Sequence, residues 1–232
     1  MMLRADMHVH TRFSKDSLSA IDAVLDAALA QGLGAIAITD HDAVEGAFEA
    51  QRRAKERGLP LQVVAGEEVT ADEGDLLVYF VKKRIAPGPL SDVLVEAGRQ
   101  KAVCCAAHPY DFARHGMALE RLEGKLVKGI GCVEVFNARV PLASMNASAM
   151  RFALSRGKAL LAGSDAHHPS GVGMAYVEFE LGGRMRLGAK ALLRAKRKIG
   201  GRRASLLARI HSRYAVARKR LAGFFGGALR IK

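Results

Sequence analysis

Thiol groups are scarce in this sequence. Its 232 residues include three cysteines, Cys104, Cys105 and Cys132, and no CxxC pair. So few thiols cannot form a disulfide framework, and without CxxC spacing they do not predict a thiolate zinc site. Cys104 and Cys105 also lie in the apolar run AVCCAAHP, where cysteines behave as small buried hydrophobes. We therefore expect no catalytic thiol.

Long apolar segments and phosphate-binding loops are also missing. No apolar run approaches the roughly 20 residues of a membrane-spanning helix, so we expect no transmembrane segment. The first residues, MMLRADMHVHTRF, lack the apolar centre of a secretory signal, and together with the few cysteines they predict a cytoplasmic location. No Walker-type glycine loop is present, which excludes NTP hydrolysis of that class.

Acidic residues are absent from the end of the chain, where the last one is Glu180. Residues 184–232 contain 16 Lys and Arg, whereas residues 1–183 contain the other 20 and all 23 Asp and Glu. The net charge of +13 therefore combines a mildly acidic body with a strongly basic tail. We predict two parts with different roles, a body over residues 1–183 and a basic helical extension over residues 184–232.

Short apolar segments alternate with helical patterns through the body. Apolar or alternating runs predict strands at residues 7–10, 35–39, 62–69, 76–81, 102–107, 131–136, 159–163 and 175–181. Helical spacing predicts helices at residues 18–31, 43–57, 89–100 and 142–156. This alternation is typical of an α/β protein whose parallel sheet is covered by helices on both faces. It leaves an open sheet and a closed barrel as alternatives.

Polar side chains gather at the carboxyl ends of the predicted strands. In a parallel barrel these ends meet on one face, where active sites are built. His8 and His10 share one side of a strand because side chains alternate, and Asp165 and His167 repeat that spacing. The full set is His8, His10, Asp40, His41, Asp42, Glu67, Glu68, His108, Glu134, Asn137, Asp165, His167 and His168.

Nitrogen and oxygen ligands without thiolate suit zinc, manganese or iron. A single histidine at a strand end is usually structural, and an HxH pair alone is weak evidence for a metal. Ligand types at so many separate strand ends are much harder to explain without one. They are too many for a single ion, so we predict two or three divalent metal ions. Such a site activates water and neutralises the charge of phosphate esters.

Four sequence blocks together resemble the polymerase and histidinol phosphatase (PHP) superfamily. They are DMHVHTRFSKDS, AIAITDHDAVEG, the AGEEVTADEGD and AAHP segments, and GSDAHHPSGVG, and they span residues 6–173. The resemblance implies a distorted (β/α)7 TIM-like barrel with a metal cluster at the carboxyl ends of its strands. It also implies a metal-dependent phosphoesterase that acts on nucleotides, phosphorylated metabolites or nucleic acid ends.

The resemblance also assigns metal ligands by position. They are His8, His10 and Asp165 for the first metal, Glu68 as a bridge, His108 for the second metal, and Asp16, His41 and His167 for the third. Glu67 is a weaker candidate than Glu68 for the bridge. The sequence departs from the family at Asp75, where many members carry a histidine ligand of the second metal. Asp75 could replace it as an oxygen ligand, or the second site could be weak or vacant.

We expect hydrolysis of a phosphate ester by a metal-activated hydroxide. Arg12 and Arg139 are candidates for binding the phosphate, since arginine suits bidentate phosphate recognition, and Asn137 is a candidate beside Arg139. Asp42 could orient the ligand histidine that precedes it, and His168 could donate a proton to the leaving group. The catalytic candidates are Asp42, Arg139 and His168, and the substrate-binding candidates are Arg12, Asn137 and Arg139.

The basic tail contains two helical patterns, over residues 190–198 and from Ser205 onward. The second carries an apolar stripe opposite basic residues, and this stripe could simply dock on the barrel. Alternatively, the tail binds nucleic acid through phosphates or contacts an anionic membrane surface peripherally. Two alternative functions follow. One is a 5′-end-directed RNA or DNA exonuclease, and the other is a catalytically idle metal-binding barrel that tethers nucleic acid or membrane through its tail.

Overall fold

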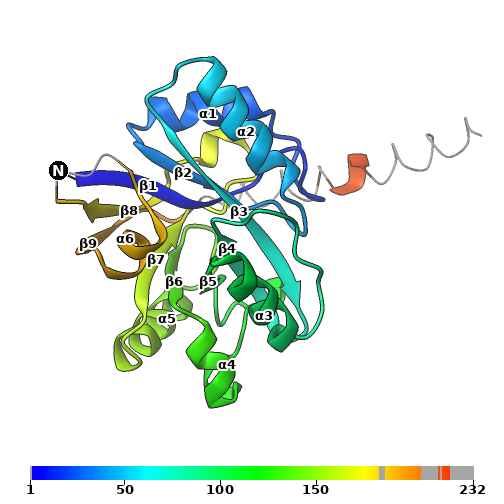
Figure 1. Ribbon diagram of the computed structural model, residues 1–232, viewed down its shortest axis with the longest axis vertical. Helices are drawn as coiled ribbons and strands as arrows, with labels where there is room; N and C mark the ends of the chain where they lie inside the picture. The colour runs from blue at the N-terminus through cyan, green and yellow to red at the C-terminus, as the bar shows by residue number, and fades with distance from the viewer. Residues whose placement is uncertain (1, 183–185, 205–213, 215, 220–232) are drawn as a thin grey trace, which may run out of the picture.

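The computed structural model of the chain describes residues 2–182, 186–204, 214 and 216–219 (Figure 1). The strands are β1 (Met2–Val9), β2 (Ala35–Ile38), β3 (Gln62–Ala71), β4 (Gly74–Tyr79), β5 (Val103–Ala106), β6 (Cys132–Asn137), β7 (Ala159–Gly163), β8 (Ala175–Glu180) and β9 (Arg197–Gly201). The α-helices are α1 (Ile21–Ala30), α2 (Glu45–Glu56), α3 (Leu90–Gln100), α4 (Gly124–Gly129), α5 (Ala143–Ser155) and α6 (Ala189–Arg194). Three short 3-10 helices are η1 (Phe112–Arg114), η2 (Leu119–Arg121) and η3 (Pro169–Gly171). The predicted alternation of strands and helices is confirmed.

The nine strands form one mixed sheet in the order β7-β6-β5-β4-β3-β2-β1-β8-β9. Strands β1, β2 and β3 pair in parallel, and so do β5, β6 and β7. Strand β4 is antiparallel to both β3 and β5, so the expectation of a fully parallel sheet is wrong here. The reason is the short connection. Only Asp72 and Glu73 separate β3 from β4, whereas a parallel pair needs a crossover of about a dozen residues or more.

The sheet curves into a nearly closed barrel. The backbone N–H of Asp165, just after β7, donates to the carbonyl oxygen of His8 at 2.7 Å. The N–H of His10 donates to the carbonyl oxygen of Ala166 at 2.9 Å. The carboxyl ends of β1 and β7 therefore lie side by side, although β7 is an edge strand of the sheet. This near-closure agrees with the TIM-like barrel that the resemblance implies. It also brings the first ligand candidates of the sequence, at the end of β1, beside the last ones, which follow β7.

Two apolar layers cover the two faces of the sheet. On the inner face, Tyr79 and Phe179 are fully buried, and the Tyr79 hydroxyl donates to the carbonyl oxygen of Met7 at 2.9 Å. The outer layer lies between the sheet and helices α1, α2, α3 and α5. In Figure 1, α1 and α2 lie on one side of the barrel and α3 and α5 on another. Because strand residues alternate in direction, Ile36 joins the outer layer and Ala37 the inner one.

The segment that follows residue 185 differs from the helix predicted over residues 190–198. Helix α6 ends at Arg194, and Arg197–Gly201 form β9, which pairs antiparallel with β8. The edge of β8 offers backbone hydrogen bonds there, and this tertiary pairing outweighs the helix propensity of residues 195–198. Part of the predicted C-terminal extension therefore belongs to the sheet. Most of the helix predicted from Ser205 lies outside the described residues.

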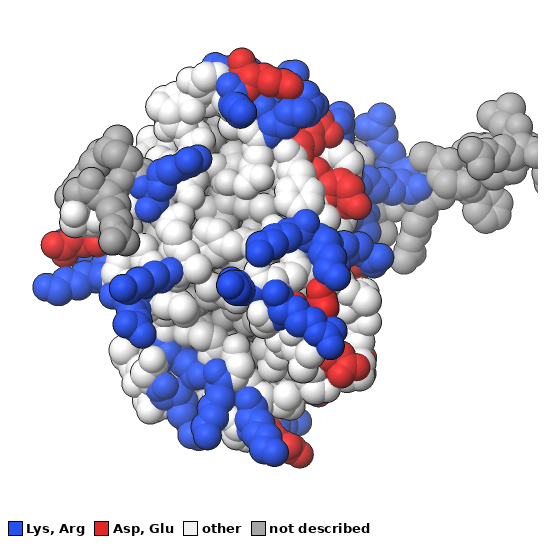
Figure 2. All heavy atoms as spheres, viewed as in Figure 1, with Lys and Arg blue, Asp and Glu red and all other residues white. Residues whose placement is uncertain are grey.

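The described part of the tail contacts the loop that follows β1. The ammonium group of Lys219 donates to the carbonyl oxygen of Arg12 at 2.7 Å and also to that of Ser14. Lys and Arg side chains are spread over much of the face shown in Figure 2. Within the residues that the structure describes, no helix is both long enough and apolar enough to cross a membrane.

Candidate metal centre

His8 and His10 lie at the centre of a polar cluster at the carboxyl end of β1. Both side chains are fully buried, and their Nε2 atoms lie 3.0 Å apart. The Oε2 atom of Glu68 lies 3.1 Å from Nε2 of His8 and 3.2 Å from Nε2 of His10. The Oδ1 atom of Asp165 lies 3.9 Å and 3.5 Å from the same two nitrogen atoms. Four donors from β1, β3 and the end of β7 thus converge on one point.

Hydrogen bonds on the far side of each ring orient these two imidazoles. The Nδ1 atom of His8 lies 3.0 Å from Oε1 of Glu134, and Nδ1 of His10 lies 3.2 Å from Oγ of Ser14. When Nδ1 carries the proton toward Glu134, the Nε2 lone pair of His8 faces the cluster. The partners therefore favour the tautomer that presents Nε2 to a cation.

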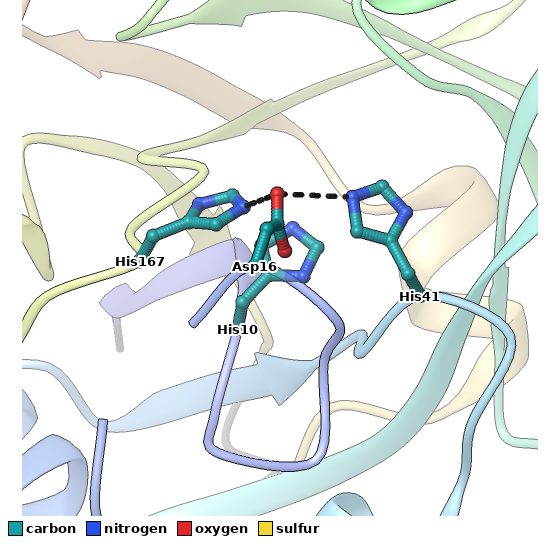
Figure 3. A group of neighbouring side chains, drawn as sticks. All are labelled: His10, Asp16, His41 and His167. Carbon is teal, nitrogen blue, oxygen red and sulfur yellow. Dashed lines mark hydrogen bonds and ion pairs between the residues drawn. The ribbon is translucent and has the colours of Figure 1, made fainter. Parts of the chain in front are cut away.

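Asp16 belongs to a second group of four side chains (Figure 3). Its Oδ2 atom lies 2.7 Å from Nε2 of His167 and 3.7 Å from Nε2 of His41. One donor atom from each of these three residues and from His10 lies within 4.8 Å of all the others. The Ser14 hydroxyl donates to Oδ1 of Asp16 at 2.9 Å. The loop after β1 therefore supplies both Asp16 and the side chain that orients it.

Glu68 connects these donors to a third group. Its Oε1 atom lies 3.0 Å from Nε2 of His108, and its Oε2 atom lies 3.4 Å from Nδ1 of His41. His41, Glu68 and Asp75 form the third candidate ligand set. Glu68 lies within β3 and not at its end, because β3 continues to Ala71. Glu68 nevertheless reaches the cluster, because the neighbouring strand β2 is shorter and ends at Ile38. His41, in the loop after β2, therefore lies beside Glu68.

The structure brings all nine predicted metal ligands into these three groups or into contact with them. They are His8, His10, Asp16, His41, Glu68, Asp75, His108, Asp165 and His167. Glu67 is separate, because its Oε2 atom accepts a hydrogen bond from the backbone N–H of Ile85 at 2.9 Å. The alternation of side chains along β3 turns the two adjacent glutamates to opposite faces.

The charges in the cluster compensate one another within a buried site. Burial raises the pKa of Glu68 and of Asp165, but neighbouring side chains outweigh burial and hold both well below the usual carboxyl range. Around Glu68 these are histidines, and around Asp165 they are chiefly Arg139 and Arg114. Burial lowers the pKa of His167 to about 3 and that of His41 to about 4, so both rings are neutral at neutral pH. Burial also lowers the pKa of His10, but Asp165 and Glu68 outweigh it and raise the pKa to about 9. A cation bound to His10 therefore displaces a proton.

This donor set fits divalent cations. The Nδ1 atoms of His41 and His108 are buried, and neither has a hydrogen-bond partner in the part of the chain that the structure describes. A buried polar atom without a partner costs free energy unless another group binds it. The donors of the cluster are imidazole nitrogen and carboxylate oxygen, which zinc, manganese and iron accept. The three groups could therefore hold metal ions.

The cluster opens into a cavity of about 470 Å³. The cavity is lined by Lys15, Asp16, His41, Glu68, Thr70, Asp75, His108, Ala113, Arg114, His115, Arg139, Asp165 and His167. The Nη1 atom of Arg139 lies 3.1 Å from Oδ1 of Asp165 and 2.6 Å from Nδ1 of His167. A small molecule in the cavity would therefore meet ligand side chains and cationic side chains together.

Arg12 and Asp42, two candidates from the sequence, do not line the cavity. The side chain of Arg12 is 53% exposed and pairs with Glu49 at 2.9 Å. The two carboxylate oxygens of Asp42 accept from the backbone N–H and the hydroxyl of Thr70, at 2.8 Å and 3.0 Å. The structure thus directs the carboxylate of Asp42 toward β3, and no hydrogen bond from it to the ring of His41 is seen among the described residues.

His168 and Asn137 also differ from their expected positions. His168 is exposed, and its Nδ1 atom lies 2.9 Å from the Ser170 hydroxyl, next to a neighbouring hollow of the surface. Asn137 is fully buried, and its amide nitrogen donates to Glu134 at 3.0 Å and to Asp165 at 3.2 Å. Asn137 therefore orients carboxylates of the cluster, whereas Arg139 alone among the substrate-binding candidates reaches the cavity.

Arg114 and His115, two further polar side chains of the cavity, lie between residues 111 and 131, a segment in which the sequence indicates no ligand. Arg114 of η1 pairs with Asp111 at 2.8 Å and with Asp165. The Nδ1 atom of His115 lies 3.0 Å from Oδ1 of Asp75. Their only signal in the sequence is the Arg-His pair before a glycine in RHGM, and such pairs are common in surface loops.

Two family models match the chain, one described as PHP domain over residues 6–134 and one described as PHP-associated over residues 143–198. The chain is 29% identical over 147 residues to an uncharacterized protein of Methanocaldococcus jannaschii, a match that covers 59% of this chain and 82% of that protein. It is 36% identical over 86 residues to a 3′,5′-nucleoside bisphosphate phosphatase of Chromobacterium violaceum. This match covers 37% of this chain and 29% of that protein.

The fold is similar to a crystal structure from Bacteroides vulgatus, a two-domain protein described as containing a predicted PHP-like metal-dependent phosphoesterase. The TM-score is 0.68 at 19% identity, and the match covers 87% of this chain but 65% of that one. The PHP model covers more than half of the chain and includes seven of the nine residues of the metal-ligand set, from His8 to His108, together with Glu134. The chain therefore belongs to the PHP domain family, a family of metal-dependent phosphoesterases.

Proposed function

We propose that the protein hydrolyses phosphate esters of small molecules, with phosphorylated nucleotides as the preferred class. The observation that carries this proposal is the meeting of the ligand cluster with Arg139 and Arg114 on the walls of one cavity. Metal cations and guanidinium groups both stabilise the charge that develops on a transferring phosphoryl group. The similarity over 86 residues to a nucleoside bisphosphate phosphatase supports the nucleotide class.

Two or three divalent cations, manganese, zinc or iron, would be held by the three ligand groups. His8, His10 and Asp165 would hold one, and Asp16, His41 and His167 another, with Glu68 between them. When bound, such cations lower the pKa of water to give a nucleophile and neutralise phosphate charge.

Arg139 and Arg114 would bind the oxygens of the phosphate. Both side chains already pair with Asp165, so their guanidinium groups are held at the wall of the cavity before substrate arrives. The side chain of Arg139 is 9% exposed and that of Arg114 is 25% exposed, so both act in a partly desolvated space. Electrostatic attraction is stronger there than in bulk water, and a preorganised donor needs no rearrangement during the reaction.

The size of the cavity favours a small substrate over the end of a nucleic acid chain. Small-molecule sites have volumes of about 300–1,000 Å³, and the cavity of about 470 Å³ lies within that range. A mononucleotide with one or two phosphates is of matching size and charge.

The test compares substrates on the purified full-length protein with added manganese. We expect phosphate release from a nucleoside 3′,5′-bisphosphate and from an aryl phosphate, with both activities lost in EDTA. A 5′-phosphorylated RNA of ten nucleotides should be a poorer substrate by at least about tenfold in kcat/KM, because its chain exceeds the cavity. Faster shortening of the RNA would favour the exonuclease, and no metal-dependent release from any ester would contradict the proposal.

A further inference from the structure

We infer that His115 is a positioning residue for a divalent-cation site formed by Glu68, Asp75 and His108. The inference rests on the proposed function, since the three ligands belong to the same cluster. It assigns a role to a side chain from the loop after η1, 40 positions along the chain from Asp75. Neither its position nor its neighbours in the sequence indicate such a role.

The contacts place Asp75 between the cluster and His115. The side chain of Asp75 is 7% exposed, and its Oδ1 atom lies 3.0 Å from Nδ1 of His115. One oxygen of Asp75 also lies within 4.8 Å of donor atoms of His41 and Glu68. Glu68 in turn lies 3.0 Å from Nε2 of His108, whose Nδ1 atom is buried with no hydrogen-bond partner among the described residues. Asp75 can thus accept from His115 and still lie within reach of the donor atoms of the cluster.

The backbone around His115 is built for this contact. The N–H of Asp75 donates to the carbonyl oxygen of His115 at 2.9 Å, which fixes the loop beside the first residues of β4. A Cβ atom on Gly74 would lie 2.8 Å from Cα of Met117, so a glycine is required for the loop to approach β4. A Cβ atom on Gly116 would lie 2.6 Å from the carbonyl oxygen of His108. The two glycines therefore allow the backbone of this loop to pack closely enough for His115 to contact Asp75.

The geometry favours an orienting role for His115 over direct coordination. The candidate ligand sets in the described ranges of the chain include Asp75 but not His115. The side chain of His115 is 48% exposed, whereas that of Asp75 is nearly buried. A donor behind a ligating carboxylate fixes the rotamer of that carboxylate, and loss of such a donor typically weakens metal binding by about 10- to 100-fold.

The test measures manganese binding to the metal-free full-length protein, without substrate, by the EPR signal of free Mn²⁺. We expect His115→Ala to weaken one class of sites by about 10- to 100-fold and to leave the others unchanged. His115→Asn should bind nearly as the wild type does, because the Asn amide nitrogen can take the place of Nδ1. Asn also tolerates the left-handed backbone of this residue, whose φ is 58°.

A double-mutant cycle shows whether His115 acts through Asp75. In an Asp75→Ala background, His115→Ala should cause no additional loss of manganese affinity. Phe112→Ala is the matched control, since it alters an exposed side chain of the adjacent η1 and should leave every class unchanged. Melting temperatures of the metal-free variants show whether each of them folds.

Three results would overturn the inference. Wild-type binding by His115→Ala would show that His115 has no part in the site. Equal losses in His115→Asn and His115→Ala would show that the ring itself is the ligand, and additive losses in the Asp75→Ala background would show an independent role. In each case, hydrolysis of phosphate esters by the wild-type enzyme would still support the proposed function. A wild type that neither binds manganese nor hydrolyses esters would contradict both proposals.

Discussion

The Nδ1 atom of His8 lies 3.0 Å from Oε1 of Glu134, although 126 positions separate the two residues in the chain. The other oxygen of Glu134 accepts the backbone N–H of His108 at 2.7 Å. One buried carboxylate on β6 therefore orients a ligand of β1 and fixes the start of the loop that follows β5. The positions of the candidate ligands are thus set by the sheet itself as well as by the loops.

Replacement of Glu134 should weaken metal binding. In Glu134→Gln the side-chain oxygen can serve His108, but the amide group then donates to Nδ1 of His8 and moves the ring proton to Nε2. We expect metal affinity to fall by about 10- to 100-fold, measured by titration of the metal-free protein with manganese. Glu49→Gln, which alters the exposed partner of Arg12, is the control and should bind as the wild type. Unchanged affinity in Glu134→Gln would show that Glu134 does not determine the tautomer.

The two cavity arginines should differ from Arg12 in their effect on catalysis. We expect Arg139→Ala and Arg114→Ala each to lower kcat/KM for a phosphate ester by about 10²-fold, as when one preorganised donor to a developing oxyanion is lost. Arg12→Ala should change kcat/KM by less than about twofold, because an exposed ion pair contributes little.

Steady-state kinetics on metal-loaded protein provide the measurement, and Arg139→Lys separates loss of charge from loss of the planar donor. An equal effect of the three alanine substitutions would indicate long-range charge and not contact with the phosphate.

The strand ends that carry the cluster could be predicted because two physical rules apply to them directly. Alternation along a strand places His8 with His10, and short apolar runs mark where β1, β2 and β7 end. The contacts of Asp42 could not be predicted in this way. Asp42 adopts a left-handed backbone with φ of 51°, which turns its carboxylate to Thr70, and no local pattern signals that conformation.

Gly163 should be essential for closing the barrel beside the cluster. A Cβ atom at this position would lie 2.2 Å from Cβ of His8 and 2.8 Å from its backbone nitrogen. We expect Gly163→Ala to lower the free energy of unfolding by about 1–3 kcal/mol, as overpacking of a core does, and to weaken metal binding.

Urea denaturation of the metal-free proteins measures the stability change. Gly98→Ala is the control, since a Cβ atom there meets nothing within 4 Å and Gly98 lies inside α3. It should raise the free energy of unfolding by up to about 1 kcal/mol. A neutral effect of Gly163→Ala would mean that β1 and β7 can separate at no cost.

The three cysteines should be unreactive in the native protein. All three are buried, and burial raises the pKa of Cys104 and of Cys132 to about 12, while the pKa of Cys105 is raised well above its usual value. Since the thiolate is the reactive form, we expect almost no reaction with 5,5′-dithiobis(2-nitrobenzoate) at pH 8 and three thiols per chain after unfolding. Rapid labelling of the folded protein would show that at least one thiol is accessible.

The contributions of Arg114 and His115 lay beyond sequence analysis for a different reason. Both come from a loop whose approach to β4 depends on the absence of Cβ atoms at Gly74 and Gly116. Periodicity identifies strands and helices but not how closely two backbones pack. Similarly, β9 forms because β8 offers a free edge, and that edge exists only in the folded sheet.

Metal content tests the central claim most directly. The protein would be purified without chelator, and divalent metals per chain would be measured by elemental analysis beside an Asp165→Ala variant. Two or three metals per wild-type chain, with fewer in the variant, is the expected result. Less than one metal per folded wild-type chain, with no uptake of added manganese, would contradict the assignment of this cluster as a metal centre.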